Sequence, residues 1–113
     1  MNNKSYKEIY MLQCDMRDYI LEYADEIDQI IKLIDSDDTE SQIIKYELNV
    51  VKNSMSEYPK SINSDINSFP HYHYIEYIKN ICDKANGDIY NKLEELVVNI
   101  ENDLDYFIEE LAL

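Results

Sequence analysis

Apolar residues recur at every third or fourth position through the first third of the chain, a spacing typical of one buried face of an α-helix. This first apolar set is Ile9, Leu12, Met16, Tyr19, Tyr23, Ile27, Ile30 and Ile34. Ser5 followed by Glu8 fits a capping box in front of it. The pattern predicts a helix from about Tyr6 to Ile34, roughly 45 Å long at about 1.5 Å per residue.

The polar segment DSDDTE, residues 35–40, interrupts this pattern, and Asp37 with Glu40 gives a second signal for the start of a helix. A second helix is therefore predicted from about Asp38 to Glu57. Its apolar positions are Ile43, Ile44, Leu48, Val51 and Met55.

A stretch rich in Ser and Asn, YPKSINSDINSF, occupies residues 58–69. We interpret it as a polar loop, with Ile62 and Ile66 packed back onto the core. A third helix is predicted from near Pro70, which suits a first helical turn, to Asn86–Gly87, where glycine suits a left-handed cap. Its inward-facing residues are Tyr74, Ile75, Ile78, Ile81 and Cys82.

A fourth helix is predicted from a cap at Asp88 almost to the end of the sequence. Its buried stripe is Ile89, Leu93, Leu96, Val97, Ile100, Leu104, Phe107, Ile108 and Leu111. One Gly and two Pro are too few for a fold rich in turns, which favours helices over sheets. We therefore predict a single all-α domain over residues 1–113. It is an antiparallel four-helix bundle with a long first helix and a polar loop between helices 2 and 3.

The formal net charge is −14, and the acids are concentrated in two segments. Residues 15–40 hold ten acids against two bases, and residues 93–113 hold seven acids and no base, whereas residues 41–92 hold six of each. Carboxylates three or four positions apart on a helix repel each other by a few tenths of a kcal/mol. This contrast indicates a binding face, although high negative charge also serves solubility alone.

We predict that the acidic faces of the first and last helices lie side by side and bind a partner. The candidate partner-binding residues are Asp15, Asp18, Glu22, Asp25, Glu94, Glu101, Asp103, Asp105, Tyr106, Glu109 and Glu110. Nucleic acid and anionic membranes attract the opposite charge, so neither is an expected partner. We expect a basic protein instead, because complementary charge speeds encounter.

Regular carboxylates on a rigid rod resemble the phosphate ladder of nucleic acid. We therefore expect a stoichiometric inhibitor of a basic nucleic-acid-processing protein. It would be either the immunity protein of a nuclease toxin or a phage-type mimic directed at a host defence nuclease. The alternative is a helical adaptor or self-associating module, such as a homodimer, that uses its Tyr-rich apolar surface. The eleven Tyr fit such an interface, but an AT-rich genome also explains them.

Catalytic and metal-binding patterns are missing from the sequence. One Gly excludes a phosphate-binding loop, and neither HExxH nor ExxH occurs. Residues 35–46 begin like a calcium loop but have Glu40 at the sixth position and Tyr46 at the twelfth. His71 and His73, two positions apart, fall on different helix faces and are expected to be ordinary surface histidines. We expect no enzyme activity, cofactor or metal.

The two cysteines and the first residues bear on location. Cys14 and Cys82 are flanked by apolar residues and are expected to be buried free thiols. The start, MNNKSYKEIY, is polar and lacks the apolar segment of a signal peptide, and no apolar run approaches 18 residues. We expect a cytoplasmic protein that does not span a membrane.

Overall fold

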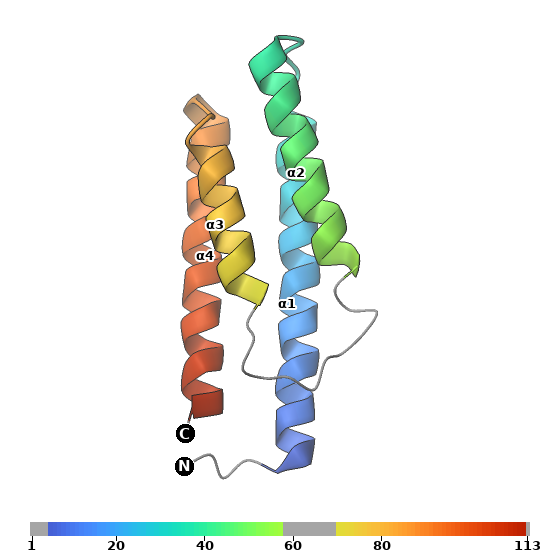
Figure 1. Cartoon of the computed structure of the whole chain (residues 1–113), viewed down its shortest axis with the longest axis vertical. Coiled ribbons are helices and arrows are strands. Elements are labelled where there is room, and N and C mark those ends of the chain that lie inside the picture. The colour runs from blue at the N-terminus through green and yellow to red at the C-terminus, as the bar shows by residue number, and fades with distance from the viewer. Residues whose placement is uncertain (1–4, 58–69, 113) are drawn as a thin grey trace.

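The computed structural model describes residues 5–57 and 70–112, which form four α-helices (Figure 1). The helices are α1 (Tyr6–Leu33), α2 (Thr39–Glu57), α3 (Pro70–Cys82) and α4 (Gly87–Ala112). The prediction of an all-α helical bundle is confirmed. The polar loop predicted over 58–69, with Ile62 and Ile66, lies outside the described residues.

The four helices are arranged as two layers of two. α1 packs against α2 and α4, and α3 packs against the same two helices. Figure 1 shows α2 and α3 in front of α1 and α4, with successive helices running in opposite directions. The bundle measures 52 × 24 × 17 Å between Cα atoms. The start of α1 and the end of α4 extend past α2 and α3 at one end, so the α1–α4 layer is the longer one.

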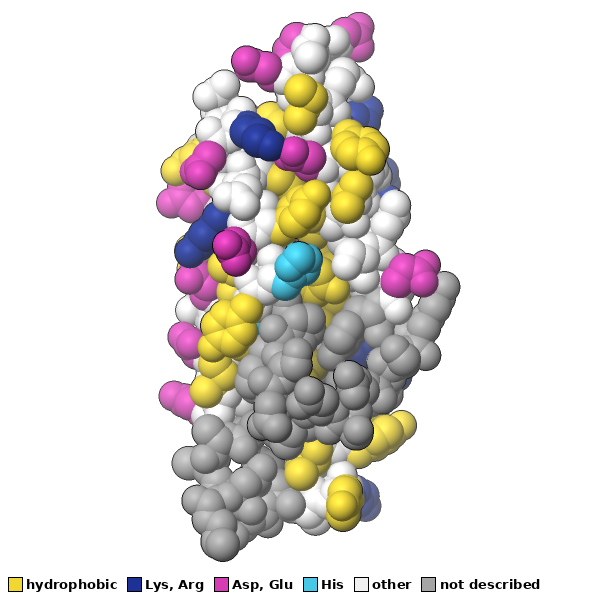
Figure 2. Space-filling model, viewed as in Figure 1, with side chains coloured by type: hydrophobic (Ala, Val, Ile, Leu, Met, Phe, Trp, Pro, Cys, Tyr) yellow, Lys and Arg dark blue, Asp and Glu magenta, His cyan; other side chains and the backbone are white. Residues whose placement is uncertain are grey.

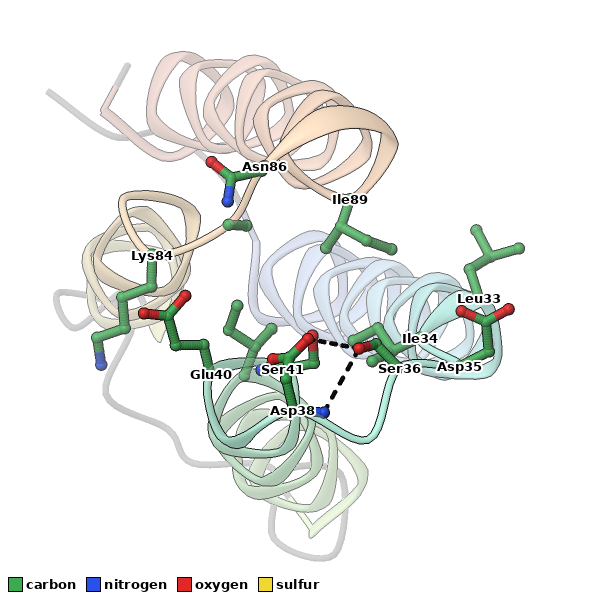
Figure 3. Close-up of a pocket in the computed structure, with 12 residues that line it drawn as sticks. Leu33, Ile34, Asp35, Ser36, Asp38, Glu40, Ser41, Lys84, Asn86 and Ile89 are labelled. Carbon is green, nitrogen blue, oxygen red and sulfur yellow. Dashed lines mark hydrogen bonds between the residues drawn. The ribbon is translucent and has the colours of Figure 1, made fainter.

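The predicted start of α1 is correct, but that of α2 shifts by one residue. The Ser5 Oγ accepts a hydrogen bond from the Glu8 backbone N–H at 3.2 Å. At α2 the Asp38 Oδ1 accepts from the Ser41 N–H at 2.7 Å, so Asp38 and not Asp37 is the cap. Ser36 donates its hydroxyl hydrogen to the Asp38 carboxylate (Figure 3). The hydrogen bond from Ser36 contributes most to lowering the pKa of the Asp38 carboxyl group, and the bond from Ser41 lowers it further. Together the two bonds fix the position of the Asp38 side chain.

The predicted junction between α3 and α4 is wrong. α3 ends at Cys82 rather than at Asn86–Gly87, because the chain tightens into a turn. In this turn the Ala85 N–H donates to the Cys82 carbonyl at 3.0 Å. Gly87 does adopt a left-handed conformation, with φ of 60°, but it is the first residue of α4. Asp88 lies inside the first turn of α4, where a carboxylate favourably faces the positive end of the helix dipole.

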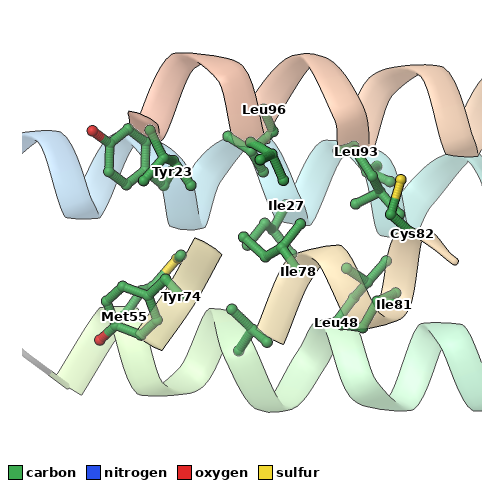
Figure 4. Packing of buried hydrophobic residues seen from close by; sticks show 14 of the residues in the cluster. Tyr23, Ile27, Leu48, Met55, Tyr74, Ile78, Ile81, Cys82, Leu93 and Leu96 are labelled. Carbon is green, nitrogen blue, oxygen red and sulfur yellow. The ribbon is translucent and has the colours of Figure 1, made fainter. Parts of the chain in front are cut away.

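The buried core is wider than the single stripe predicted on α1. Ile20, Ala24 and Ile31 are buried in addition to most of the predicted set. This follows because α2 and α4 cover α1 on two sides. Two predicted core residues, Tyr19 and Ile43, are instead 37% and 46% exposed. Figure 4 shows side chains of all four helices meeting in this core.

His71 contradicts the prediction of a surface histidine. Its side chain is 0% exposed, while that of His73 is exposed. The His71 ring centroid lies 6.1 Å from that of Tyr23 on α1 and 5.8 Å from that of Phe107 on α4. The first turn of α3 therefore places this ring against the α1–α4 layer. Both cysteines are free thiols, with Cys82 buried and Cys14 only half-buried.

Candidate functional site

Three acidic residues of α1 lie together on a solvent-facing side of the helix near α4. Asp15, Asp18 and Glu22 line a shallow depression of about 270 Å³ together with Tyr19. The Tyr19 ring contacts Phe107 of α4 at a centroid distance of 5.6 Å, which places this depression beside α4. Asp25 is exposed and follows Glu22 by three residues on the helix surface.

The acids of α4 divide between two sides of the helix. Asp103 faces α1, where it accepts a hydrogen bond from Tyr23. Glu101 faces α3, since its Oε2 lies 3.8 Å from the Lys79 Nζ. Residues two positions apart on a helix point to different sides, so one strip cannot hold both.

The other candidate residues of α4 follow these two sides. Glu94 shares a depression between α3 and α4 with Glu101 and Lys79. Asp105 and Glu109 are exposed and continue the Glu101 row at steps of four residues. Tyr106, 47% exposed, and the half-buried Glu110 follow Asp103 at spacings of three and seven. The candidate set is therefore brought together only in part.

A groove between α1 and α4 extends the acidic surface toward the other end of the bundle. Its volume is about 460 Å³. The lining residues are Glu26, Gln29, Ile30, Leu33, Lys92, Glu95, Leu96 and Asn99. Ile30 and Leu96 are buried and form an apolar floor. Glu26 and Glu95, on opposite helices, are exposed at its sides.

The electrostatics of Glu26 show how closely the carboxylates converge. Partial desolvation of its carboxyl group beside the groove raises the pKa of Glu26, and the negative charges of Glu22, Glu95 and Asp103 raise it further. Two of these neighbours belong to α4, so the repulsion acts across the groove. A cationic side chain placed there would relieve this repulsion. We define the acidic seam as Asp15, Asp18, Glu22, Glu26, Glu95 and Asp103.

Glu26 and Glu95 were absent from the residues predicted from sequence. A usable signal existed, because Glu26 follows Glu22 by one helical turn and Glu95 lies two turns before Asp103. Asp28, close to Glu26 in sequence, has a different role. It holds α1 to α2 by binding the Lys52 Nζ at 3.0 Å, and it also pairs with Lys32 at 3.1 Å.

Ion pairs engage individual acids both outside the seam and within it. Lys84 pairs with Glu47 at 2.7 Å, and Lys79 lies near Glu101. Within the seam, Arg17 contacts Asp18 at 3.4 Å. Among residues 5–57 and 70–112, no ion pair includes the other seam members, Asp15, Glu22, Glu26, Glu95 and Asp103.

The charge is divided between the two layers of the bundle. The helices of the α1–α4 layer contain 15 acids and 4 bases, and those of the α2–α3 layer contain 4 acids and 3 bases. Within the described helices, the acidic excess therefore lies almost entirely in one layer. On the α2–α3 side, Figure 2 shows acidic side chains mainly along one edge and at the end of the molecule.

A smaller pocket of about 200 Å³ lies at the end of the bundle where the short connections meet (Figure 3). Ile34, Ile44 and Ile89 line it, with acids at its rim. Asp38, one of these acids, is already engaged as the cap of α2. Leu33 lines both this pocket and the α1–α4 groove, so the groove reaches the end of the bundle.

No protein-family model, curated protein or solved structure matches the chain. Within the part of the chain that the structure describes, no group of three or more His, Cys, Asp or Glu is placed to hold a metal ion. None of the helices in those same residues combines the length and apolarity needed to cross a bilayer. The fold and site define an acidic helical bundle with a like-charged seam between its first and last helices.

Proposed function

We propose that the protein is a stoichiometric inhibitor that binds a basic nucleic-acid-processing protein through the acidic seam. The observation that supports this most directly is that Glu26 of α1 and Glu95 of α4 line the same groove, while Asp103 of α4 is bound to α1. Like charges held together on a folded surface oppose folding slightly. Binding a positively charged partner removes that repulsion and so favours the complex.

The chemistry of the seam suits a protein that normally holds nucleic acid. Such a protein presents Lys and Arg spaced to meet a series of phosphates. Carboxylates along two adjacent helices offer a comparable series of negative charges on a rigid support. The partner is accordingly a nuclease or a nuclease toxin. The inhibitor then acts either as the toxin's immunity protein or as a phage-type mimic.

The proposed mode of action is binding alone, without catalysis or a cofactor. Long-range attraction between the seam and the basic partner raises the encounter rate. The seam then occupies the surface that would otherwise hold nucleic acid. We place this activity in the cytoplasm, because the two free thiols Cys14 and Cys82 suit a reducing compartment.

The test is titration of the protein into candidate basic nucleases, beginning with any toxin encoded beside it. Cleavage should stop near equimolar protein. A seam variant, Glu22→Gln with Glu26→Gln and Glu95→Gln, should lose inhibition while retaining its helical circular dichroism. The matched control is Glu94→Gln with Glu101→Gln and Asp105→Asn, which also removes three charges. Full inhibition by the seam variant would overturn the proposed site.

A further inference from the structure

The α2–α3 layer exposes an apolar stripe that the acidic seam does not use. Ile43, Tyr46 and Val50 of α2 are 46%, 71% and 39% exposed. They follow one another at spacings of three and four residues, so they share one side of the helix. Figure 2 shows hydrophobic side chains gathered on this face, with acidic side chains at its edges and a few among them.

Helix α3 continues this surface with aromatic rings. Tyr77 is half-buried against the core. The exposed His73 ring lies 6.1 Å from the Tyr77 ring and 5.9 Å from the Tyr74 ring, measured between centroids. We call the combined surface of Ile43, Tyr46, Val50, His73 and Tyr77 the neutral face. Tyr is favoured in interfaces because it offers a large contact area at low entropic cost.

The neutral face differs from the rest of the molecule in charge. The described helices that form it contain 4 acids and 3 bases. At one end of it, Glu40, Asp83 and Lys84 share a shallow depression with Ile43, and Lys84 pairs with Glu47 of α2 at 2.7 Å. A surface that is apolar and nearly uncharged contributes little steering toward a strongly basic partner. We therefore expect this surface to bind something other than the basic partner of the acidic seam.

We propose that the neutral face is the surface through which two copies of this chain associate. Each copy has a formal charge of −14, so two copies repel in most orientations. Pairing the neutral faces keeps the two α1–α4 layers on opposite outer sides of the dimer, which minimises that repulsion. The acidic seam of each copy then remains exposed.

The layer that carries the neutral face is comparable in outline with a standard protein interface. The 19 residues of α2 extend about 29 Å at about 1.5 Å per residue. Multiplied by the 24 Å width of the bundle, this gives an outline of about 700 Å² for the whole α2–α3 layer, against the roughly 800 Å² a side of a standard interface. In a two-fold dimer each patch meets its own copy, so the apolar stripes of the two α2 helices can cover each other.

Salt separates this proposal from the proposed function, on which it does not depend. Added salt screens the repulsion between two acidic copies, so the dimer should be more stable at about 500 mM than at about 50 mM NaCl. Binding of a basic partner should change in the opposite direction. Either proposal can therefore fail while the other stands.

The experiment is sedimentation velocity combined with light scattering over a range of protein concentrations and both salt levels. The unmodified chain should reach twice its 13.5 kDa mass. Val50→Glu should remain monomeric with unchanged helicity. Val98→Glu is the control, because Val98 is a valine of similar exposure, 49%, on α4. A monomer at every concentration and salt level, or equal disruption by both variants, would overturn the proposal.

Discussion

The Tyr23 hydroxyl on α1 donates a hydrogen bond to the Asp103 carboxylate on α4, with 2.5 Å between the two oxygens. Tyr23 is 3% exposed, and its burial raises the pKa of the phenol above its usual value, as does the bond to Asp103. The phenol is therefore a neutral hydrogen-bond donor at neutral pH. This bond fixes one carboxylate of the acidic seam between the two helices of its layer.

Removing the Tyr23 hydroxyl should destabilise the bundle. Tyr23→Phe leaves the ring packing intact but deprives a partly buried carboxylate of its donor. The loss should be about 1–2 kcal/mol in the free energy of unfolding, measured by urea denaturation. Tyr10→Phe, at an exposed position of α1 outside the neutral face, is the control and should have no measurable effect. Equal stability of the Tyr23 variant and the unmodified protein would mean that the bond contributes nothing.

Because His71 is buried, the free energy of unfolding should depend on pH between about 4 and 6.5. Desolvation lowers the pKa of this imidazole from 6.5 to about 4 in the folded protein. The unfolded chain consequently binds more protons between these values. The free energy of unfolding should therefore be unaffected by His71 above about pH 6.5. It should decrease by about 3 kcal/mol as the pH falls to about 4. The pKa values of Asp28 and Asp38 are lowered from 3.8, so protonation of these two carboxylates changes stability only below this pH range.

Proton NMR of the native protein provides the direct measurement, since the chain has only two histidines. The His71 ring should remain neutral until the pH approaches 4. Urea denaturation at several pH values should show the corresponding loss of stability. His71→Phe should abolish this part of the pH dependence, whereas His73→Phe should retain it. A native His71 that titrates near its ordinary value would contradict the buried position.

The helices could be predicted from the sequence because their apolar residues keep a helical period over three to eight turns. The burial of His71 was missed, although His71 lies three, four and seven residues before Tyr74, Ile75 and Ile78 and so shares their helical period, because a polar residue next to a predicted loop gives little sign of burial. It is buried because the first turn of α3 meets Tyr23 and Phe107, which come from distant parts of the chain. Contacts of this kind depend on how whole helices pack.

The candidate site could also be predicted only as far as it does not depend on how the helices pack. The acidic segments and their helices follow from the sequence, as does the fact that Glu101 and Asp103 point to different sides. Which side faces α1 and which faces α3 requires the arrangement of all four helices. Lys79 then neutralises part of one side, and Tyr23 positions an acid on the other.

Neutralising Glu26 should stabilise the protein at neutral pH. Its pKa is raised above 4.5, mainly by partial desolvation and then by Glu22 and Glu95. The folded protein holds the Glu26 proton more tightly than the unfolded chain does. This adds to stability below pH 4.5, and the added stability is lost as the pH rises through the folded-state pKa of Glu26. Glu26→Gln should therefore gain a few tenths of a kcal/mol at pH 7 and little at pH 4. Asp28→Asn should instead lose stability at pH 7, because it breaks the ion pairs with Lys32 and Lys52.

The salt dependence of partner binding distinguishes a directed acidic seam from charge that serves only solubility. If the seam faces the basic partner, the association rate should fall steeply as ionic strength rises, as stopped-flow or surface-based kinetics can measure. The triple change Glu22→Gln, Glu26→Gln and Glu95→Gln should flatten this dependence and speed dissociation. The triple change Glu94→Gln, Glu101→Gln and Asp105→Asn alters the net charge equally but should leave the dissociation rate unchanged. Because the two variants match in total charge, equal effects on both rates would show that the partner responds to net charge and not to the seam.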